Sequence, residues 1–379
     1  MRLSTIALVD FRTYTKAIFA FPEQTTIIVG PNAIGKTNIL EAITLSSWGK
    51  SFRATRDSDM VAWGKEVAHV EVVSGQEANE QESSDEQLSL RVDITVGQVN
   101  GTKTPMKRYF VNGVPRRLID FSGKLKTVLF SPPDLSMLTL SPGVRREYLD
   151  TVLSLTDAEY RRSLLSYERG IRQRNALLAS IRDGESRENQ LFFWDQLIIK
   201  NGQYLTDARS EFIGFTNSFV YDDLTYRCQY VPSLVTKERL ESHRQAEIAS
   251  GMTLVGPQRD DFILFQKRDT PNVQNAQTEV ARYGSRGEQR LGVLWLRLAE
   301  LSYIEEKTGS RPVLLLDDIF SELDHESRKI VLDVIGKQQT IITSADRDIS
   351  HDLASTPSLD WIYLTDTKKQ TVYNTTGDL

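Results

Sequence analysis

The chain has 379 residues, of which 40% are hydrophobic and 26% charged, and its formal net charge is −5. This composition is ordinary for a globular protein of two or three domains, and it argues against an overall basic nucleic-acid binder. The longest apolar runs, such as residues 313–316, are only as long as a strand and too short to cross a bilayer. A single cysteine, Cys228, excludes an internal disulfide, and the N-terminus lacks the apolar core of a signal peptide, so we expect a cytoplasmic protein.

The N-terminal region predicts short strands at residues 4–10, 17–21 and 25–29, the last of which ends at a glycine. A helix is expected over residues 36–47, because its apolar positions recur at helical spacing. Alternating residues then predict a hairpin made of two segments, 67–73 and 88–96. The polar stretch between them, residues 74–87, has five acids and no large apolar residue, and is expected to be a mobile loop.

The middle of the chain, residues 143–220, is helical in pattern and rich in charge, with a natural break at Gly184. We interpret it as a helical hairpin or small bundle, too short for a long coiled-coil arm. The sequence then returns to α/β character, with a helix over 286–306 and a strand over 311–316. The expected domains are residues 1–140, a helical lobe at 141–230, and residues 231–379.

A phosphate-binding loop is predicted between the third strand and the first helix. Its glycines let backbone N–H groups wrap phosphates, and the helix N-terminus adds favourable partial charge. Lys36 would reach the β- and γ-phosphates, and Thr37 would supply a hydroxyl to Mg²⁺. The predicted nucleotide-binding residues of this loop are Gly30, Pro31, Asn32, Ala33, Ile34, Gly35, Lys36 and Thr37.

Two adjacent carboxylates, Asp317 and Asp318, follow the apolar residues 313–316 and so lie at the carboxyl edge of a buried strand. Asp317 is the expected Mg²⁺ ligand, directly or through water, and Asp318 is placed to orient or deprotonate an attacking water. Lys36 and Asp318 are therefore the catalytic candidates. The alternative is a helix-capping pair after a core strand. Thr343, at the end of a further apolar strand, is expected near the γ-phosphate.

The pattern Ser285-x-Gly287-Glu288-Gln289 opens the helix that leads to the acidic strand. One interpretation is a capped helix start, with Ser285 and Glu288 as a capping box. The other is an anion site, in which Ser285 and the helix N-terminus contact the γ-phosphate of a nucleotide bound to a second subunit. The position of the motif about thirty residues before the acidic strand favours the anion site.

Basic residues gather with few acids between them, so a basic face could exist on this acidic protein, although a solvated edge would give the same pattern. The candidates for contacts with DNA phosphates are Lys103, Lys107, Arg108, Arg116 and Arg117, with Arg53 and Arg56 in addition.

Together the phosphate-binding loop, the Ser285 motif, the acidic pair and Ser321-Glu-Leu-Asp324 resemble the head of an ATP-binding-cassette ATPase. Their wide separation by a helical insert resembles the DNA-handling branch that includes the structural-maintenance-of-chromosomes proteins, and most of all the RecF family. The motifs that carry this likeness are Asp10-Phe11-Arg12-Thr-Tyr14, Leu40-Glu41-Ala42-Ile43, Gly49-Lys50-Ser51-Phe52-Arg53, Phe130-Ser131-Pro132, Arg145-Arg146-x-Tyr148-Leu149-Asp150 and Gly256-Pro257-Gln258-Arg259-Asp260-Asp261. Two residues depart from the family pattern: Pro133 stands where an acid is usual, and Gln258 where histidine is usual.

The resemblance implies an α/β fold, an ABC-ATPase head with a P-loop and a mixed or parallel sheet, interrupted by a helical second lobe. It implies that ATP binds one monomer through Lys36, Thr37 and Asp317, while a second monomer closes over it with Ser285, Gly287 and Gln289. The ATP-bound homodimer would clamp DNA at single-strand gaps and promote RecA loading with RecO and RecR. Slow, DNA-dependent ATP hydrolysis would reset the clamp. A small SMC-like ATPase of another DNA-maintenance pathway is the alternative.

Three other classes fit less well. The ATPase subunit of a membrane transporter keeps these motifs much closer together and needs a histidine near Thr343. A chromosome-organising protein needs a coiled coil of hundreds of residues, and an ATP-dependent nuclease needs a further carboxylate-rich domain.

Overall fold

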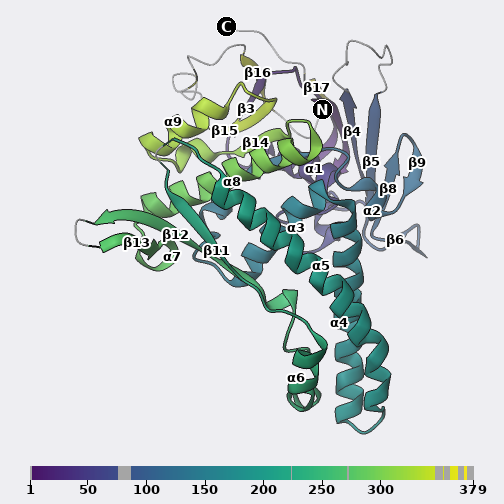
Figure 1. Cartoon of the computed structure of the whole chain (residues 1–379). Coiled ribbons are helices and arrows are strands. Elements are labelled where there is room, and N and C mark those ends of the chain that lie inside the picture. The colour runs from purple at the N-terminus through teal and green to yellow at the C-terminus, as the bar shows by residue number, and fades with distance from the viewer. Residues whose placement is uncertain are drawn as a thin grey trace. The chain divides into compact units, whose positions relative to one another are not determined.

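The computed structural model describes residues 2–75, 87–222, 224–270, 273–345, 353, 359–365 and 371–373, and the chain divides into two compact units (Figure 1). Unit 1 consists of Met1–Asp134 and Ile304–Leu379, and unit 2 of Leu135–Tyr303. The predicted helical lobe ends at residue 230, whereas unit 2 continues to Tyr303, because residues beyond 230 form a sheet and a helix within that unit. No helix in the described part of the chain is long and apolar enough to cross a membrane.

The first sheet of unit 1 has the strand order β17-β2-β1-β4-β5-β8-β9 and is antiparallel except where β17 pairs with β2. It contains the predicted N-terminal strands and the predicted hairpin, whose intervening polar stretch lies mostly outside the described residues. The strands are β1 (Arg2–Phe11), β2 (Tyr14–Ala20), β4 (Val67–Gly75), β5 (Leu88–Thr95), β8 (Lys107–Val111), β9 (Val114–Arg116) and β17 (Thr371–Tyr373).

The second sheet of unit 1 is parallel throughout, in the order β10-β14-β15-β3-β16. Its central strands are buried along their whole length, which is why their sequences are continuous apolar and β-branched runs without alternation. Because the strands are parallel, the loops after β3, β14 and β15 leave from the same edge. The strands are β3 (Thr25–Val29), β10 (Thr127–Phe130), β14 (Val313–Asp317), β15 (Thr340–Ser344) and β16 (Leu359–Tyr363).

Helix α1 (Lys36–Trp48) contacts strands of both sheets and forms part of one apolar core with them. Its sequence is apolar or small on nearly every side, and Gly49 ends it in the left-handed conformation that glycine adopts at little cost. The predicted α/β class is therefore confirmed. The other helices that begin in unit 1 are the short α2 (Leu118–Phe121) and α9 (His325–Val334).

Unit 2 contains the predicted helical hairpin, formed by α4 (Ala158–Arg182) and α5 (Leu191–Ser218) with the predicted break at Gly184 between them (Figure 1). The sequence analysis missed an antiparallel sheet in this unit, β11 (Tyr226–Val231), β12 (Asp261–Thr270) and β13 (Val273–Glu279). Its first two strands are separated by a helix, so no local hairpin signal marks their pairing. The remaining helices are α3 (Pro142–Thr156), α6 (Lys237–Ser250), α7 (Val280–Tyr283) and α8 (Arg286–Thr308), the last of which ends in unit 1.

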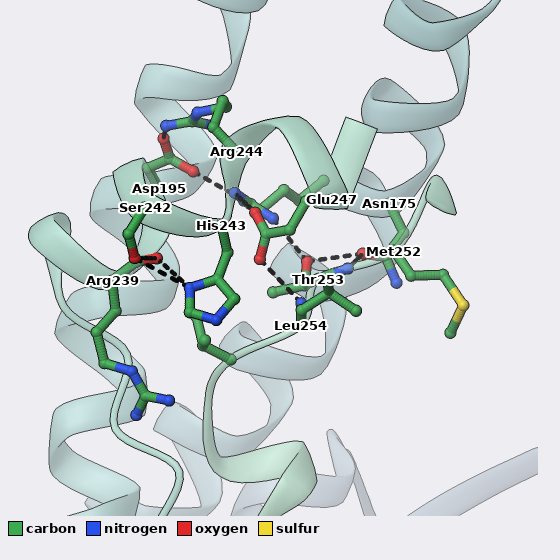
Figure 2. Close-up of polar contacts among 12 residues, drawn as sticks. Asn175, Asp195, Arg239, Ser242, His243, Arg244, Glu247, Met252, Thr253 and Leu254 are labelled. Carbon is green, nitrogen blue, oxygen red and sulfur yellow. Dashed lines mark hydrogen bonds and ion pairs between the residues drawn. The ribbon is translucent and has the colours of Figure 1, made fainter. Parts of the chain in front are cut away.

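A buried ionic network joins α6 to the α4/α5 hairpin. Arg174 of α4 is fully buried and donates to Asp195 Oδ1 at 2.8 Å and to Glu247 Oε2 at 2.6 Å. Asp195 also accepts from Arg244, and Glu247 from the backbone N–H of Leu254, as Figure 2 shows. Each carboxylate thus has a cation partner, which is the condition under which buried charges are tolerated.

A second network in unit 2 explains two of the sequence motifs that carry the family likeness. Arg145 holds Asp261 through two hydrogen bonds of 2.6 and 3.0 Å, and the buried Arg209 donates to Asp260 and Asp150. Gln258 accepts a hydrogen bond from the hydroxyl of Tyr167. These motif residues therefore have structural roles within unit 2.

Candidate nucleotide-binding site

The phosphate-binding loop leaves β3 at Val29 and enters α1 at Lys36. Ala33 and Gly35 both have positive φ, at 63° and 113°. A Cβ on Gly35 would lie 2.9 Å from Thr13 Oγ1 and 3.0 Å from Tyr14 Oη, so both the backbone conformation and the space around it require glycine.

The turn between β1 and β2 braces this loop. The Tyr14 hydroxyl donates to the Gly35 carbonyl at 3.2 Å, and the side-chain amide of Asn38 donates to Thr13 Oγ1 at 2.9 Å. Arg53 in turn donates to Asn38 Oδ1 at 2.8 Å. Asn38 therefore links the start of α1 to two neighbouring segments.

Glu41 of α1 is a fully buried carboxylate that gathers three side chains. Arg12 donates to its Oε2 at 2.8 Å, Ser51 to its Oε1 at 2.5 Å, and Arg53 Nε lies 3.2 Å from Oε2. Three separate sequence motifs thus meet at Glu41, within the helix that follows the phosphate-binding loop. Sequence reasoning did not assign this role to Glu41; an acidic residue amid the apolar positions of the predicted helix was its only signal.

Lys36 points back over the loop. Its Nζ donates to the Gly30 carbonyl at 2.6 Å and to the Pro31 carbonyl at 3.1 Å. Burial lowers the pKa of Lys36, an effect opposed by the nearby carboxylates of Asp318 and Asp317. The ammonium group is therefore held at the loop, on the side of the acidic strand.

Asp317, at the end of β14, receives two hydroxyl groups on one oxygen. Thr37 Oγ1 donates to Oδ1 at 2.9 Å and Thr343 Oγ1 at 2.8 Å. A hydroxyl and a carboxylate side by side are hard oxygen donors of the kind that Mg²⁺ takes. Thr343 is 1% exposed, and its hydroxyl oxygen also accepts from the backbone N–H of Asp318 at 3.1 Å, so this side chain positions the Asp317 carboxylate.

Asp318 has a left-handed backbone, with φ of 49°, a conformation that aspartate adopts more readily than most residues other than glycine and asparagine. Burial raises the pKa of its carboxyl, and the charges of Asp317 and Glu322 add to this. The backbone N–H of Ala345 and the ammonium of Lys36 oppose the rise in the pKa.

The Ser285 motif forms the predicted capping box at the start of α8. The backbone N–H of Ser285 donates to Glu288 Oε2 at 2.6 Å, and that of Glu288 donates to Ser285 Oγ at 3.2 Å. Because Oγ accepts in this pair, its proton remains available to donate. The Gln289 amide instead donates to the carbonyls of α7 and its end, those of Val280, Ala281 and Gly284.

The predicted DNA-contacting cations differ in their environments. Lys107 donates to the Gly49 carbonyl at 3.0 Å and lies 2.9 Å from Asp57, so its charge is used within the fold. Arg53 is engaged by Glu41 and Asn38, and Arg117 lies 3.3 Å from Asp120. Lys103 is exposed on β7 (Thr102–Lys103), Arg108 on β8 and Arg116 on β9. The side chains of Arg117, which follows β9, and of Arg56 are exposed as well.

The family model described as RecF/RecN/SMC N terminal domain matches residues 2–362 of this chain. The DNA replication and repair protein RecF of Herpetosiphon aurantiacus is 34% identical over 373 residues, which cover 92% of this chain and 94% of that protein. The chain belongs to the RecF family. RecF of an Exiguobacterium species is also 34% identical, over 93% of this chain and 95% of that protein.

Solved structures agree with this assignment to the RecF family. The recombination mediator protein RecF-ATPrS of the RecFOR pathway superposes with a TM-score of 0.81 at 27% identity, covering 98% of this chain and 97% of that one. The corresponding RecF-ATP structure gives 0.81 at 26% identity, covering 99% and 98%. An Smc head domain from Pyrococcus furiosus, at 16% identity and a TM-score of 0.50 over 99% of this chain and 96% of that one, shares the fold alone.

Proposed function

We propose that this RecF-family chain is an ATP-dependent DNA-binding protein of replication and recombinational repair, in which ATP joins two copies of the head. The observation that carries the proposal is the hydrogen bond between Thr37 and Asp317 beside the phosphate-binding loop, whose carbonyls also bind the Lys36 ammonium group. The relatives solved as RecF-ATP and RecF-ATPrS support ATP as the ligand.

In the proposed mechanism, Lys36 exchanges its two backbone carbonyl partners for the β- and γ-phosphate oxygens. Thr37 and Asp317 would hold Mg²⁺, which neutralises charge on the phosphates when bound. Thr343 keeps the Asp317 carboxylate in place from below. Asp318 orients the attacking water and takes its proton as the bond between the γ-phosphorus and the leaving ADP oxygen breaks. Its short side chain suits slow hydrolysis.

The site on one chain is half of the proposed whole. Ser285 and Gly287 of a second copy would supply a hydroxyl and the N-terminus of α8 to the γ-phosphate. ATP binds the closed dimer better than the open monomer and therefore shifts the population towards the dimer. Loss of the γ-phosphate removes this preference and releases the second copy.

The closed dimer would hold DNA at single-strand gaps through the exposed cations of the β8–β9 region. From the chain's membership of the RecF family, we infer that its partners are RecO and RecR and that it promotes the loading of RecA. We place this activity in the cytoplasm. An SMC-like role in another DNA-maintenance pathway remains the second candidate, supported by the shared head fold.

DNA affinity measured against salt, with ATP and Mg²⁺ present, tests the proposal. We expect the logarithm of the affinity to fall linearly with that of the salt concentration, and Lys36→Ala to bind DNA weakly at every salt concentration. ATP-independent binding, or a flat salt response, would contradict it.

A further inference from the structure

A tyrosine of β11 holds the first turn of α8 from outside that helix. Tyr226 Oη donates a hydrogen bond to the Glu288 carbonyl at 3.1 Å. Glu288 is also the residue whose backbone N–H and carboxylate form the capping box with Ser285. The hydrogen bond from Tyr226 therefore restrains the residue on which the placement of the Ser285 hydroxyl depends.

The ring of Tyr226 is itself held by packing against α8. The Tyr226 side chain is buried, and the centroid of its ring lies 5.8 Å from that of Trp295, which is also buried. A Cβ on Gly292, one turn after Glu288, would lie 3.4 Å from Tyr226 Cε1 and 2.6 Å from Leu264 Cδ2 of β12. Strands β11 and β12 thus approach the helix so closely that the tyrosine ring has little freedom to move its hydroxyl away from the Glu288 carbonyl.

The turn before α8 is closed tightly as well. A Cβ on Gly284 would lie 2.6 Å from the Val280 carbonyl oxygen. Gln289 Nε2 donates to the carbonyls of Val280, Ala281 and Gly284 at 3.2 to 3.3 Å. Ser285 is exposed between these two restrained segments, so an ordered backbone presents its hydroxyl.

We propose that Tyr226 is a positioning residue of the composite ATP site. It would act through Glu288 to place the Ser285 hydroxyl and the N-terminus of α8 against the γ-phosphate of ATP bound to the second copy. This inference rests on the proposed function and deepens it, because it assigns the support of the second copy's contribution to a residue that touches no nucleotide. A misplacement of about 1 Å can cost a reaction roughly 100-fold, so the loss of one hydroxyl here should be measurable.

Tyr226→Phe removes only this hydroxyl and keeps the packed ring. Tyr148→Phe is the matched control, because Tyr148 Oη donates to another carbonyl of α8, that of Leu296, also at 3.1 Å. That carbonyl lies roughly two turns further along the helix, away from Ser285. The two variants should have similar denaturant midpoints, and dilute monomers of both should bind ATP as the wild type does. Only Tyr226→Phe should lower ATP turnover and the affinity of the ATP-dependent dimer, each by roughly 5- to 50-fold.

Mixed dimers separate a role across the interface from a role within one chain. Asp318→Asn chains should bind ATP and present an intact Ser285 turn without hydrolysing their own nucleotide. An excess of them should raise turnover per Tyr226→Phe chain to near the wild-type level, because each ATP beside a functional Asp318 then faces an unaltered Ser285 turn. The same excess should leave turnover per wild-type chain unchanged.

Two results would overturn the inference and leave the proposed function intact, provided that ATP doubles the mass of the wild type. One is equal turnover and dimer affinity in Tyr226→Phe and Tyr148→Phe. The other is turnover of Tyr226→Phe that Asp318→Asn chains do not raise, which would mean that the tyrosine acts only within its own chain. A wild type whose mass ATP does not change would contradict the proposed function itself.

Discussion

Thr37 Oγ1 donates a hydrogen bond to Asp317 Oδ1 at 2.9 Å, across 280 positions of sequence. The two residues meet because β3 and β14 run parallel in the same sheet, with β15 between them, so the segments that follow the strands share one edge. Thr343, which ends the intervening strand β15, places a second hydroxyl on the same carboxylate oxygen. The proposed Mg²⁺ ligands are thus organised at one edge of the sheet where these strands end.

Thr343→Val keeps the shape of the side chain and removes its hydroxyl. We expect ATP turnover to fall roughly 10- to 100-fold, as for other residues that orient a metal ligand. ATP affinity without Mg²⁺ should change little, since Lys36 and the loop remain. Thr343→Ser is the control and should restore turnover, and steady-state ATPase assays beside nucleotide titrations measure both. Full activity in Thr343→Val would show that Asp317 needs no such support.

Gly35→Ala should destabilise the phosphate-binding loop. The new Cβ would sit 2.9 Å from Thr13 Oγ1 in a backbone with φ of 113°, a strain of roughly 1–3 kcal/mol. We expect the affinity for ATP to fall as well, because this strain disturbs the loop that would hold the phosphates. Gly64→Ala is the matched control. Its φ is also positive, at +77°, but no atom lies within 4 Å of the position that a Cβ would take. We therefore expect the free energy of unfolding to fall by only about 1 kcal/mol and ATP binding to be normal. Equal ATP affinities in the two variants would contradict the role of the Thr13–Tyr14 brace.

Glu41→Gln removes a buried charge from between Arg12 and Arg53. We expect the free energy of unfolding to fall by about 3 kcal/mol, because the guanidinium of Arg12, whose side chain is only 17% exposed, loses its counter-charge. Glu305→Gln breaks a half-exposed pair with Arg311, at 2.9 Å, and should cost less than about 1 kcal/mol. Urea denaturation of both variants measures the difference. Similar midpoints would mean that the Glu41 network is not a stability element.

Asp318→Asn should stabilise the fold and stop hydrolysis. The raised pKa of Asp318 means that the folded state binds its proton more tightly than the unfolded state does. Wild-type stability therefore falls as pH rises from the ordinary carboxyl pKa through the raised one, and the advantage of Asn should grow over that window. Asn also tolerates a left-handed φ well. Denaturant midpoints between about pH 4 and pH 8 test this, with the exposed Asp120→Asn as a control expected to change little.

The parts of the fold and site with local signals could be predicted from sequence. The apolar run before Asp317 and the glycines around Lys36 identify a buried strand and a phosphate loop, and both lie where expected. The contacts of a side chain carry no local signal. The hydrogen bond from Thr343 to Asp317 is an example, because the register of β15 against β14 brings the two residues together.

The charge pattern of the sequence also does not show which cations are free to contact DNA, because their partners within the fold carry no local signal. Lys107 belongs to the basic stretch and Arg53 was an additional candidate, but the partners of these two side chains are a backbone carbonyl and carboxylates elsewhere in the chain. The sheet of unit 2 was missed because β11 and β12 pair across an intervening helix.

The central claim, that ATP joins two heads through a composite site, is tested most directly by light scattering with and without ATP and Mg²⁺. Ser285→Ala, Lys36→Ala and the wild type should all have the mass of one chain without nucleotide. With ATP and Mg²⁺, we predict that the wild type doubles its mass, while Lys36→Ala and Ser285→Ala remain single chains. Ser285→Thr, which keeps a capping hydroxyl, should still dimerise. A wild type whose mass ATP does not change would contradict the account.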